Sequence, residues 1–147
     1  MIDLLKDADV RKVLAHFHEK AKPTALICHG PISLVAAIPE ADKYVAALAE
    51  NKAKEAKRLA KGWPYAGYRM TIFSTSEEKT AEKTKLGAKM LFYPEDALRA
   101  AGGKVQVGKD WQSNVVQDRE LITGQNPSSD DKLAELFVAA LNNSPKP

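Results

Sequence analysis

The chain has little cysteine, no long apolar run and only a small excess of positive over negative charge, and each of these features excludes a class of protein. Its 147 residues include one cysteine, so an internal disulfide and a zinc site built on several thiolates are both excluded. No apolar run is long enough to cross a bilayer, and the first residues are too highly charged for a secretion signal. The net charge is only +3, without a nucleic-acid motif or a nucleotide-binding motif. We therefore expect a cytoplasmic protein with no membrane or nucleic-acid partner, no metal and no cofactor.

What is present is the composition of one ordinary globular domain. Hydrophobic residues make up 44% and charged residues 28% of the chain, as is usual for such domains. Segments typical of strands alternate with segments typical of helices, which predicts a layered α/β fold. The expected strands cover residues 24–27, 68–73, 114–117 and 120–123, and the expected helices cover residues 9–21, 32–38, 40–62, 76–85, 94–101 and 128–141. Few strands precede the cysteine, so we expect a thin sheet.

The single cysteine, Cys28, lies where an apolar strand runs directly into a helix. A sharp turn of this kind exposes a side chain above the sheet, and the free N–H groups of the following helix stabilise a thiolate, so the thiol pKa should be low. Gly30 should leave room for the turn, Pro31 suits the first helical position, and the His29 backbone N–H is placed to donate to an oxyanion. The same pattern also fits an inert cysteine at the end of a buried strand, so both interpretations stay open at this point.

Four blocks of sequence, in the same order and at matching spacing, resemble the ThiJ/PfpI superfamily, relatives of the class I glutamine amidotransferase domains. Residues 25–31 (ALICHGP) resemble the family's nucleophile elbow, and residues 121–127 (LITGQNP) resemble its later strand and turn. Residues 92–98 (FYPEDAL) and 115–118 (VVQD) fit as well. The resemblance therefore covers nearly the whole chain and favours a reactive cysteine over an inert one.

The resemblance implies a flavodoxin-like layered α/β sandwich with a mostly parallel sheet. Residues 1–147 would form a single partial domain, with residues 40–62 as an inserted helix. In the family, several strands precede the position where this chain begins; one carries a glutamate that hydrogen-bonds the thiol, and a Gly-Gly-His-type loop supplies a second oxyanion donor. Residues 1–5 resemble those directly after that loop. The N-terminal strands are thus expected to be missing, and it stays open whether this chain alone is an active enzyme.

The resemblance also assigns roles at the site. A histidine directly after the cysteine points to the branch that includes heat-shock chaperones and glutathione-independent glyoxalases. In that branch Cys28 would be the nucleophile, His29 the acid or base, and a carboxylate near the end of the strand at residues 68–73 would be their partner. Glu77 is our first assignment for this carboxylate and Glu78 the alternative. Both residues also suit the exposed start of a helix, where carboxylates favour the dipole.

Several functions stay compatible with this sequence. The first is a glyoxalase III-type or deglycase-like enzyme that uses Cys28 on small reactive aldehydes such as methylglyoxal. The second is a cysteine amidase or peptidase of the PfpI type, because the same turn and oxyanion donor serve acyl transfer. The third is a stress-response chaperone or holdase without catalysis, and the fourth is an inactive fragment. Apolar faces left uncovered by a thin sheet predict a homodimer or larger homo-oligomer.

Overall fold

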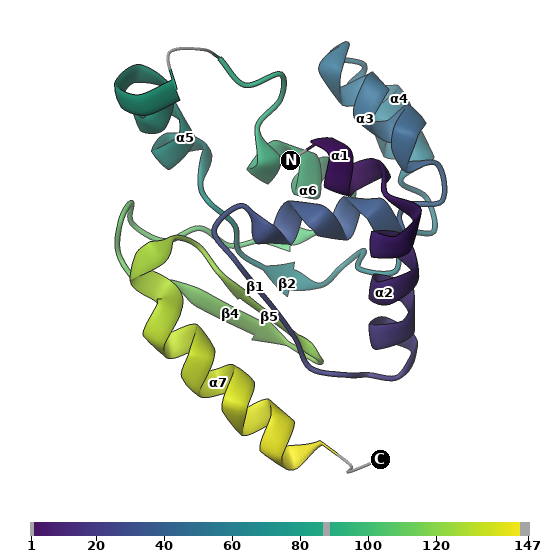
Figure 1. Cartoon of the computed structure of the whole chain (residues 1–147). Coiled ribbons are helices and arrows are strands. Elements are labelled where there is room, and N and C mark those ends of the chain that lie inside the picture. The colour runs from purple at the N-terminus through teal and green to yellow at the C-terminus, as the bar shows by residue number, and fades with distance from the viewer. Residues whose placement is uncertain (1, 87–88, 145–147) are drawn as a thin grey trace.

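A three-stranded sheet lies at the centre of the computed structural model, which describes residues 2–86 and 89–144 (Figure 1). Strand β1 (Thr24–Ile27) pairs in parallel with β5 (Leu121–Gly124), and β4 (Val115–Asp118) pairs antiparallel with the other edge of β5. A second, two-stranded sheet consists of the parallel strands β2 (Arg69–Met70) and β3 (Lys104–Val105). The predicted α/β class with mostly parallel pairing is confirmed.

Helices cover these sheets on both sides. They are α1 (Ile2–Lys6), α2 (Ala8–Glu19), the 3-10 helix η1 (Gly30–Ala37), α3 (Ala41–Ala49), α4 (Ala53–Leu59), α5 (Thr75–Ala81), the π-helical turn η2 (Glu82–Leu86), α6 (Pro94–Ala100), the 3-10 turn η3 (Pro127–Ser129) and α7 (Asp130–Asn143). Helix α7 packs along β1 and β5, whereas η1 lies among α1, α2 and α6 (Figure 1). Within the described ranges, no helix combines the length and the apolar character that a membrane span requires.

The helix that follows Cys28, η1, forms the middle of the hydrophobic core. All of its residues from Pro31 to Ala37 except Ser33 are buried, as its apolar composition on every face predicts. Its carbonyl groups are satisfied by side chains from distant elements, since the Trp63 indole donates to the Leu34 carbonyl at 2.8 Å and the Arg11 guanidinium donates to the Ala36 carbonyl at 2.9 Å. The segment behind Cys28 is therefore held by packing and by hydrogen bonds.

Residues 40–62, predicted as one inserted helix, form two helices, α3 and α4. Asn51 has a left-handed backbone with φ of +55° between them. Its N–H donates to the Leu48 carbonyl, and the Lys52 N–H donates to the Ala47 carbonyl, which is the hydrogen-bond pattern that ends helices at a left-handed residue. The prediction of one helix was wrong because the apolar stripe continues across this break.

The strand predicted at residues 68–73 is shortened to two residues, β2. The Thr71 N–H donates to the side-chain oxygen of Thr123 at 2.8 Å, and the Phe73 N–H donates to the carbonyl of Cys28 at 2.9 Å. These contacts take the segment out of regular pairing. They also connect it directly to the ends of β1 and β5.

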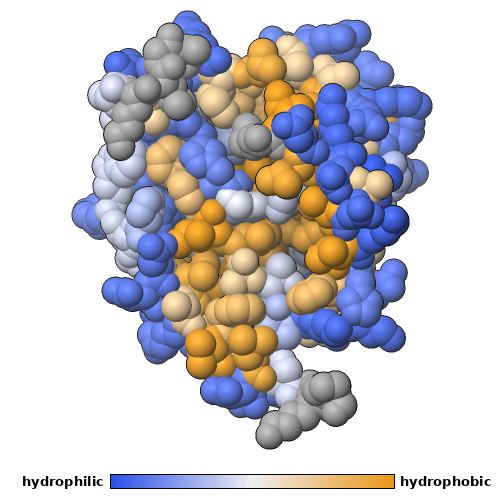
Figure 2. All heavy atoms as spheres, in the orientation of Figure 1, coloured by the Kyte–Doolittle hydropathy of each residue, from blue (hydrophilic) through white to orange (hydrophobic). Residues whose placement is uncertain are grey.

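One face of the molecule, formed by β1 and α7, is less buried than the rest; we name it the β1–α7 face. Strand β1 is an edge strand, and its four residues are half-buried, whereas all four residues of β5 are buried. Helix α7 has no fully buried residue, and its Leu141 side chain is 49% exposed. Apolar residues gather over this part of the molecule (Figure 2).

Candidate active site

Cys28 lies directly after β1 in a left-handed backbone conformation, with φ of +59°. For a residue with a Cβ atom this conformation costs roughly 1–2 kcal/mol. Both backbone polar groups are held, because the Cys28 N–H donates to the Gly124 carbonyl and the Phe73 N–H donates to the Cys28 carbonyl, each at 2.9 Å. Strain of this kind persists only where the surroundings fix it, and it is concentrated at functional sites. The sharp strand-to-helix turn expected at this position is present.

Gly30, expected to leave room for this turn, does not have a left-handed backbone. An added Cβ atom would lie 3.6 Å from the Cβ atom of Leu26, an ordinary contact. An alanine would therefore fit at this position. The conformational strain of the turn is borne by Cys28 instead.

Three side chains form a line of contacts that starts at the thiol. The Sγ atom of Cys28 lies 3.3 Å from Nδ1 of His29, and Nε2 of His29 lies 2.5 Å from Oε1 of Glu78. The Glu78 side chain is 1% exposed and the His29 side chain 43% exposed. Nucleophile, base and orienting carboxylate in contact with one another are the usual arrangement for covalent catalysis.

The pKa of the His29 imidazole reflects its contacts with both neighbouring side chains. Its contact with the Cys28 thiol raises the pKa of His29 above the ordinary 6.5, the charge of Glu78 raises it further, and partial burial opposes both effects. The protonated imidazole is thus favoured between the two side chains. A cationic histidine beside a thiol is the pairing that cysteine nucleophiles commonly use.

Glu78, the alternative assignment, is the carboxylate that reaches His29, and Glu77, the first assignment, does not contact it. Both residues are buried near the start of α5. Consecutive residues of a helix point in different directions, so only one of the two can face the imidazole. Glu77 instead accepts hydrogen bonds from the backbone at Ser74 and Trp111.

Two aromatic side chains border the imidazole. The Phe73 ring lies 4.8 Å from the His29 ring, and the Trp111 ring lies 5.5 Å from the Phe73 ring at an angle of 70°. Trp111 has a left-handed φ of +62° and is 47% exposed. No pattern in the sequence singles out Phe73, whose position becomes evident only from the contact of its backbone with Cys28.

Two polar groups of this site have no hydrogen-bond partner among the described residues. Among the described residues, the His29 backbone N–H donates to no acceptor of the protein, and the buried Oε2 atom of Glu78 has no hydrogen-bond partner. In residues 2–86 and 89–144 no three His, Cys, Asp or Glu side chains are placed to hold a metal ion. The site thus offers a thiol, an acid–base pair and one backbone donor.

No family model matches the chain, but curated relatives do. It is 28% identical over 129 residues to the glutamine amidotransferase-like class 1 domain-containing protein 1 of Bos taurus, covering 88% of this chain and 49% of the relative. It is 25% identical over 146 residues to the protein/nucleic acid deglycase HchA of Staphylococcus aureus, covering 98% of this chain and 43% of the relative. The chain spans about half the length of the curated relatives it matches.

Solved structures match over a similar range. One, known only by a target code, superposes with a TM-score of 0.72 at 31% identity and covers 95% of this chain and 53% of the other. The Rapid Encystment Protein of 24 kDa from Francisella tularensis gives 0.67 at 28% identity, covering 95% and 52%. Glyoxalase III from Candida albicans gives 0.63 at 23% identity, covering 94% and 51%, and shows the fold alone. Sequence blocks, relatives and fold agree: the chain has a flavodoxin-like α/β fold and is similar to glutamine amidotransferase-like class 1 domain proteins and to the HchA deglycase, as its resemblance to the ThiJ/PfpI superfamily implies.

Proposed function

We propose that this chain carries the cysteine site of a glyoxalase III-type, glutathione-independent or deglycase-like enzyme that acts on small reactive aldehydes such as methylglyoxal. The line of contacts from Cys28 through His29 to Glu78, at a strained turn, is the observation that carries the proposal. Two similar proteins are named a deglycase and a glyoxalase III. This chain spans about half the length of these relatives. That it has their activity is therefore part of the proposal.

With methylglyoxal, the Cys28 thiolate would attack the aldehyde carbon and form a C–S bond, and the carbonyl oxygen would take up a proton to give a hemithioacetal. His29 would then remove the hydrogen of this carbon as a proton and return a proton to the neighbouring carbon, while the hydroxyl proton passes to the oxygen of that neighbouring carbon, so that the carbon bonded to sulfur becomes a carbonyl. The product is a thioester of lactate. Water would break the C–S bond, releasing lactate and the free thiol, so the net reaction adds one water to methylglyoxal.

The test is consumption of methylglyoxal together with formation of lactate. We expect Cys28→Ala and His29→Ala to lose the activity of the wild-type chain. His16→Ala is the matched control, because His16 is exposed and contacts Lys22 rather than the site. Equal rates for wild type and Cys28→Ala would sink the proposal.

A cysteine amidase or peptidase is the second candidate, favoured by the His29 backbone N–H, which donates to no acceptor among the described residues and would serve as an oxyanion donor. Incubation with an activated ester or peptide would then leave an acyl group on Cys28, detected by mass spectrometry. Acylation without methylglyoxal turnover would select this candidate. Suppression of client aggregation, equal in wild type and Cys28→Ala, would instead favour the chaperone alternative. The cytoplasmic location expected from the sequence stays a prediction.

A further inference from the structure

A buried carboxylate beside the site, that of Glu77, has no part in the proposed reaction. Its side chain is fully buried and accepts four hydrogen bonds, all from N–H donors. Oε1 accepts from the Trp111 backbone at 2.8 Å and from the Asn126 side chain at 2.7 Å. Oε2 accepts from the Ser74 backbone at 2.9 Å and from the Gln125 side chain at 3.0 Å. Burying a carboxylate is costly unless it is hydrogen-bonded, so this environment is specific for a side chain with acceptors alone.

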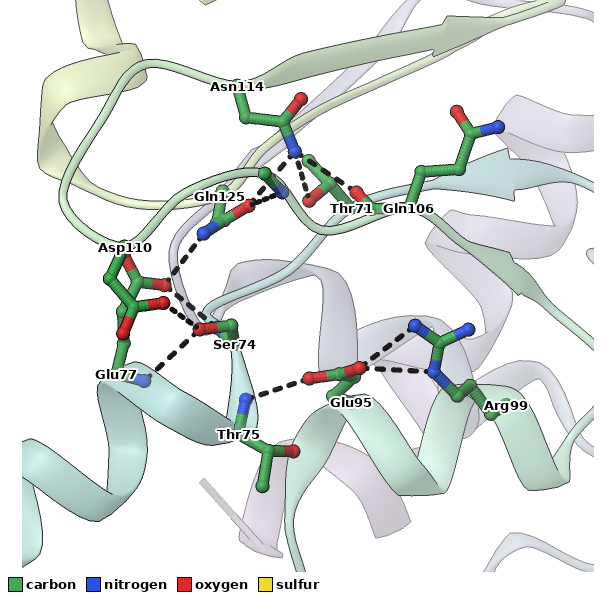
Figure 3. A network of polar contacts seen from close by, with 11 residues as sticks. Thr71, Ser74, Thr75, Glu77, Glu95, Arg99, Gln106, Asp110, Asn114 and Gln125 are labelled. Carbon is green, nitrogen blue, oxygen red and sulfur yellow. Dashed lines mark hydrogen bonds and ion pairs between the residues drawn. The ribbon is translucent and has the colours of Figure 1, made fainter.

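These donors belong to three separate segments. Ser74 caps the start of α5, Trp111 lies in the loop between β3 and β4, and Gln125 and Asn126 follow β5. Figure 3 shows Ser74, Glu77, Asp110 and Gln125 converging where these segments meet. The Gln125 side chain extends the network, because its oxygen accepts from the Gly108 N–H at 2.7 Å and from the Asn114 amide at 2.9 Å.

A helix cap alone does not account for this arrangement. The reciprocal contacts between Glu77 and Ser74 form a capping box, which needs only residues three apart in the chain. The other three donors, from Trp111, Gln125 and Asn126, lie 34, 48 and 49 residues away. Glu77 thus connects the start of α5 to two distant segments.

Two of these segments, the start of α5 and the end of β5, are flanked by groups that contact Cys28 or His29, and Trp111 of the third lies against Phe73. Glu78 follows Glu77 on α5 and lies against His29. Phe73 precedes Ser74 in the chain, and its N–H binds the Cys28 carbonyl. Gly124 precedes Gln125, and its carbonyl accepts the Cys28 N–H. The neighbours of the Glu77 donors are therefore the residues that fix the turn.

We propose that Glu77 is the positioning residue of this site. Its carboxylate holds three segments together, and this places Glu78 against His29 and keeps Cys28 in its strained conformation. The kinetic part of this inference rests on the proposed function, whereas the geometric part does not.

The test is Glu77→Gln, which keeps the shape of the side chain. Each oxygen of the Glu77 carboxylate accepts two hydrogen bonds. Whichever oxygen the glutamine side-chain nitrogen replaces, this nitrogen, itself a donor, would face two N–H donors, and both of those hydrogen bonds would be lost. Glu120→Gln is the matched control, because Glu120 is another buried carboxylate, 5% exposed and contacted by His18 and Tyr68, at the opposite end of β5. Both variants should lose stability, but only the first should alter the site.

The first readout is the NMR titration of His29, whose titratable neighbours are Cys28 and Glu78. We expect Glu77→Gln to lower the titration midpoint of His29, as Glu78→Gln does. The double variant should show no change beyond that of Glu78→Gln alone. The second readout is kinetic: kcat for methylglyoxal should fall on the order of a hundredfold, as for misplaced catalytic groups, with little change in KM. Glu120→Gln should leave the His29 midpoint at the wild-type value.

A wild-type His29 midpoint in folded Glu77→Gln would overturn the inference, and so would additive effects of Glu77→Gln and Glu78→Gln. If Glu77→Gln does not fold, Asn126→Ala removes one of the four donors and is measured in the same titration. A lowered midpoint in that variant supports the inference, and an unchanged one overturns it. If the wild-type chain does not consume methylglyoxal, the proposed function fails, and the titration still decides the role of Glu77.

Discussion

At the scale of single residues, the site depends on which of two adjacent carboxylates faces the imidazole. The sequence blocks led to Cys28 and His29 directly, because their order in the chain fixes their proximity. They did not separate Glu77 from Glu78, since both residues suit the first turn of a helix. The choice depends on where α5 begins, and that position is set by Ser74, whose side chain accepts from the Glu77 N–H. A shift of one residue in this cap would exchange the two roles.

The same residues predict how stability depends on pH. Since the folded-state pKa of His29 lies above its ordinary 6.5, the folded state binds the proton more tightly than the unfolded chain. The contribution of His29 is therefore fully present below about pH 6.5 and is lost as the pH rises through the folded-state pKa. We expect the free energy of unfolding of wild type, relative to His29→Gln, to be largest in that lower range. Urea denaturation between pH 5 and 9 measures this difference, and a difference that grows with pH would contradict the prediction.

At the scale of elements, contacts between segments decided what local patterns did not. The apolar stripe through residues 40–62 gave no sign of the break at Asn51, although an asparagine in a run of alanine and lysine is a plausible helix end. The extended segment after Arg69 satisfied the strand pattern, but its N–H groups bind Thr123 and Cys28 instead of a neighbouring strand. Strands β1, β4 and β5 were predicted correctly to within one residue, because strong apolar runs and a short turn define them.

Gly124 provides a prediction at this scale, because it lies where β5, β1 and α7 pack together. A Cβ atom on Gly124 would lie 3.0 Å from Cβ of Ser129 and 3.1 Å from both Cγ1 of Ile27 and Cδ1 of Leu133. We expect Gly124→Ala to cost about 1–3 kcal/mol, as overpacked sites do. It should also slow methylglyoxal turnover, because the Gly124 carbonyl holds Cys28.

The control for Gly124→Ala is Gly30→Ala, whose added Cβ makes only an ordinary contact with Leu26. Urea denaturation of the two variants should show a clear loss for Gly124→Ala and a change within about 0.5 kcal/mol for Gly30→Ala. Equal losses of unfolding free energy in the two variants would contradict the prediction that close packing around Gly124 makes this position sensitive.

At the scale of the whole molecule, the sequence predicted the class of fold and the shortage of strands around the cysteine. It could not predict how much of β1 and α7 this shortage of strands leaves exposed. Strand β1 is an uncharged, half-buried edge, and such edges invite pairing with another chain. Helix α7 beside it buries no residue completely. We therefore propose that two or more copies associate through the β1–α7 face.

Replacing exposed apolar side chains of α7 with lysine tests this association. Val138 and Leu141 are 55% and 49% exposed on the β1–α7 face, and Leu91, at 65%, lies in the segment before α6. We expect sedimentation of the wild-type chain to show a species heavier than one chain. The double variant Val138→Lys/Leu141→Lys should sediment as a single chain, and Leu91→Lys should behave as wild type. A wild-type chain that sediments as a monomer at all concentrations would contradict the prediction.

The two backbone bonds of Cys28 also have a consequence for how the site is assembled during synthesis. The Gly124 carbonyl that holds the Cys28 N–H is made long after the cysteine itself, and closing so long a loop has an entropic cost that is recovered only when the distant partners meet. Until β5 has been made and has paired with β1, the contact that holds the Cys28 N–H is absent, and Cys28 samples the ordinary backbone conformations of a flexible chain. The left-handed conformation of Cys28 is therefore among the last features that a nascent chain acquires. Formation of this turn would therefore report that β5 has been made and has paired with β1.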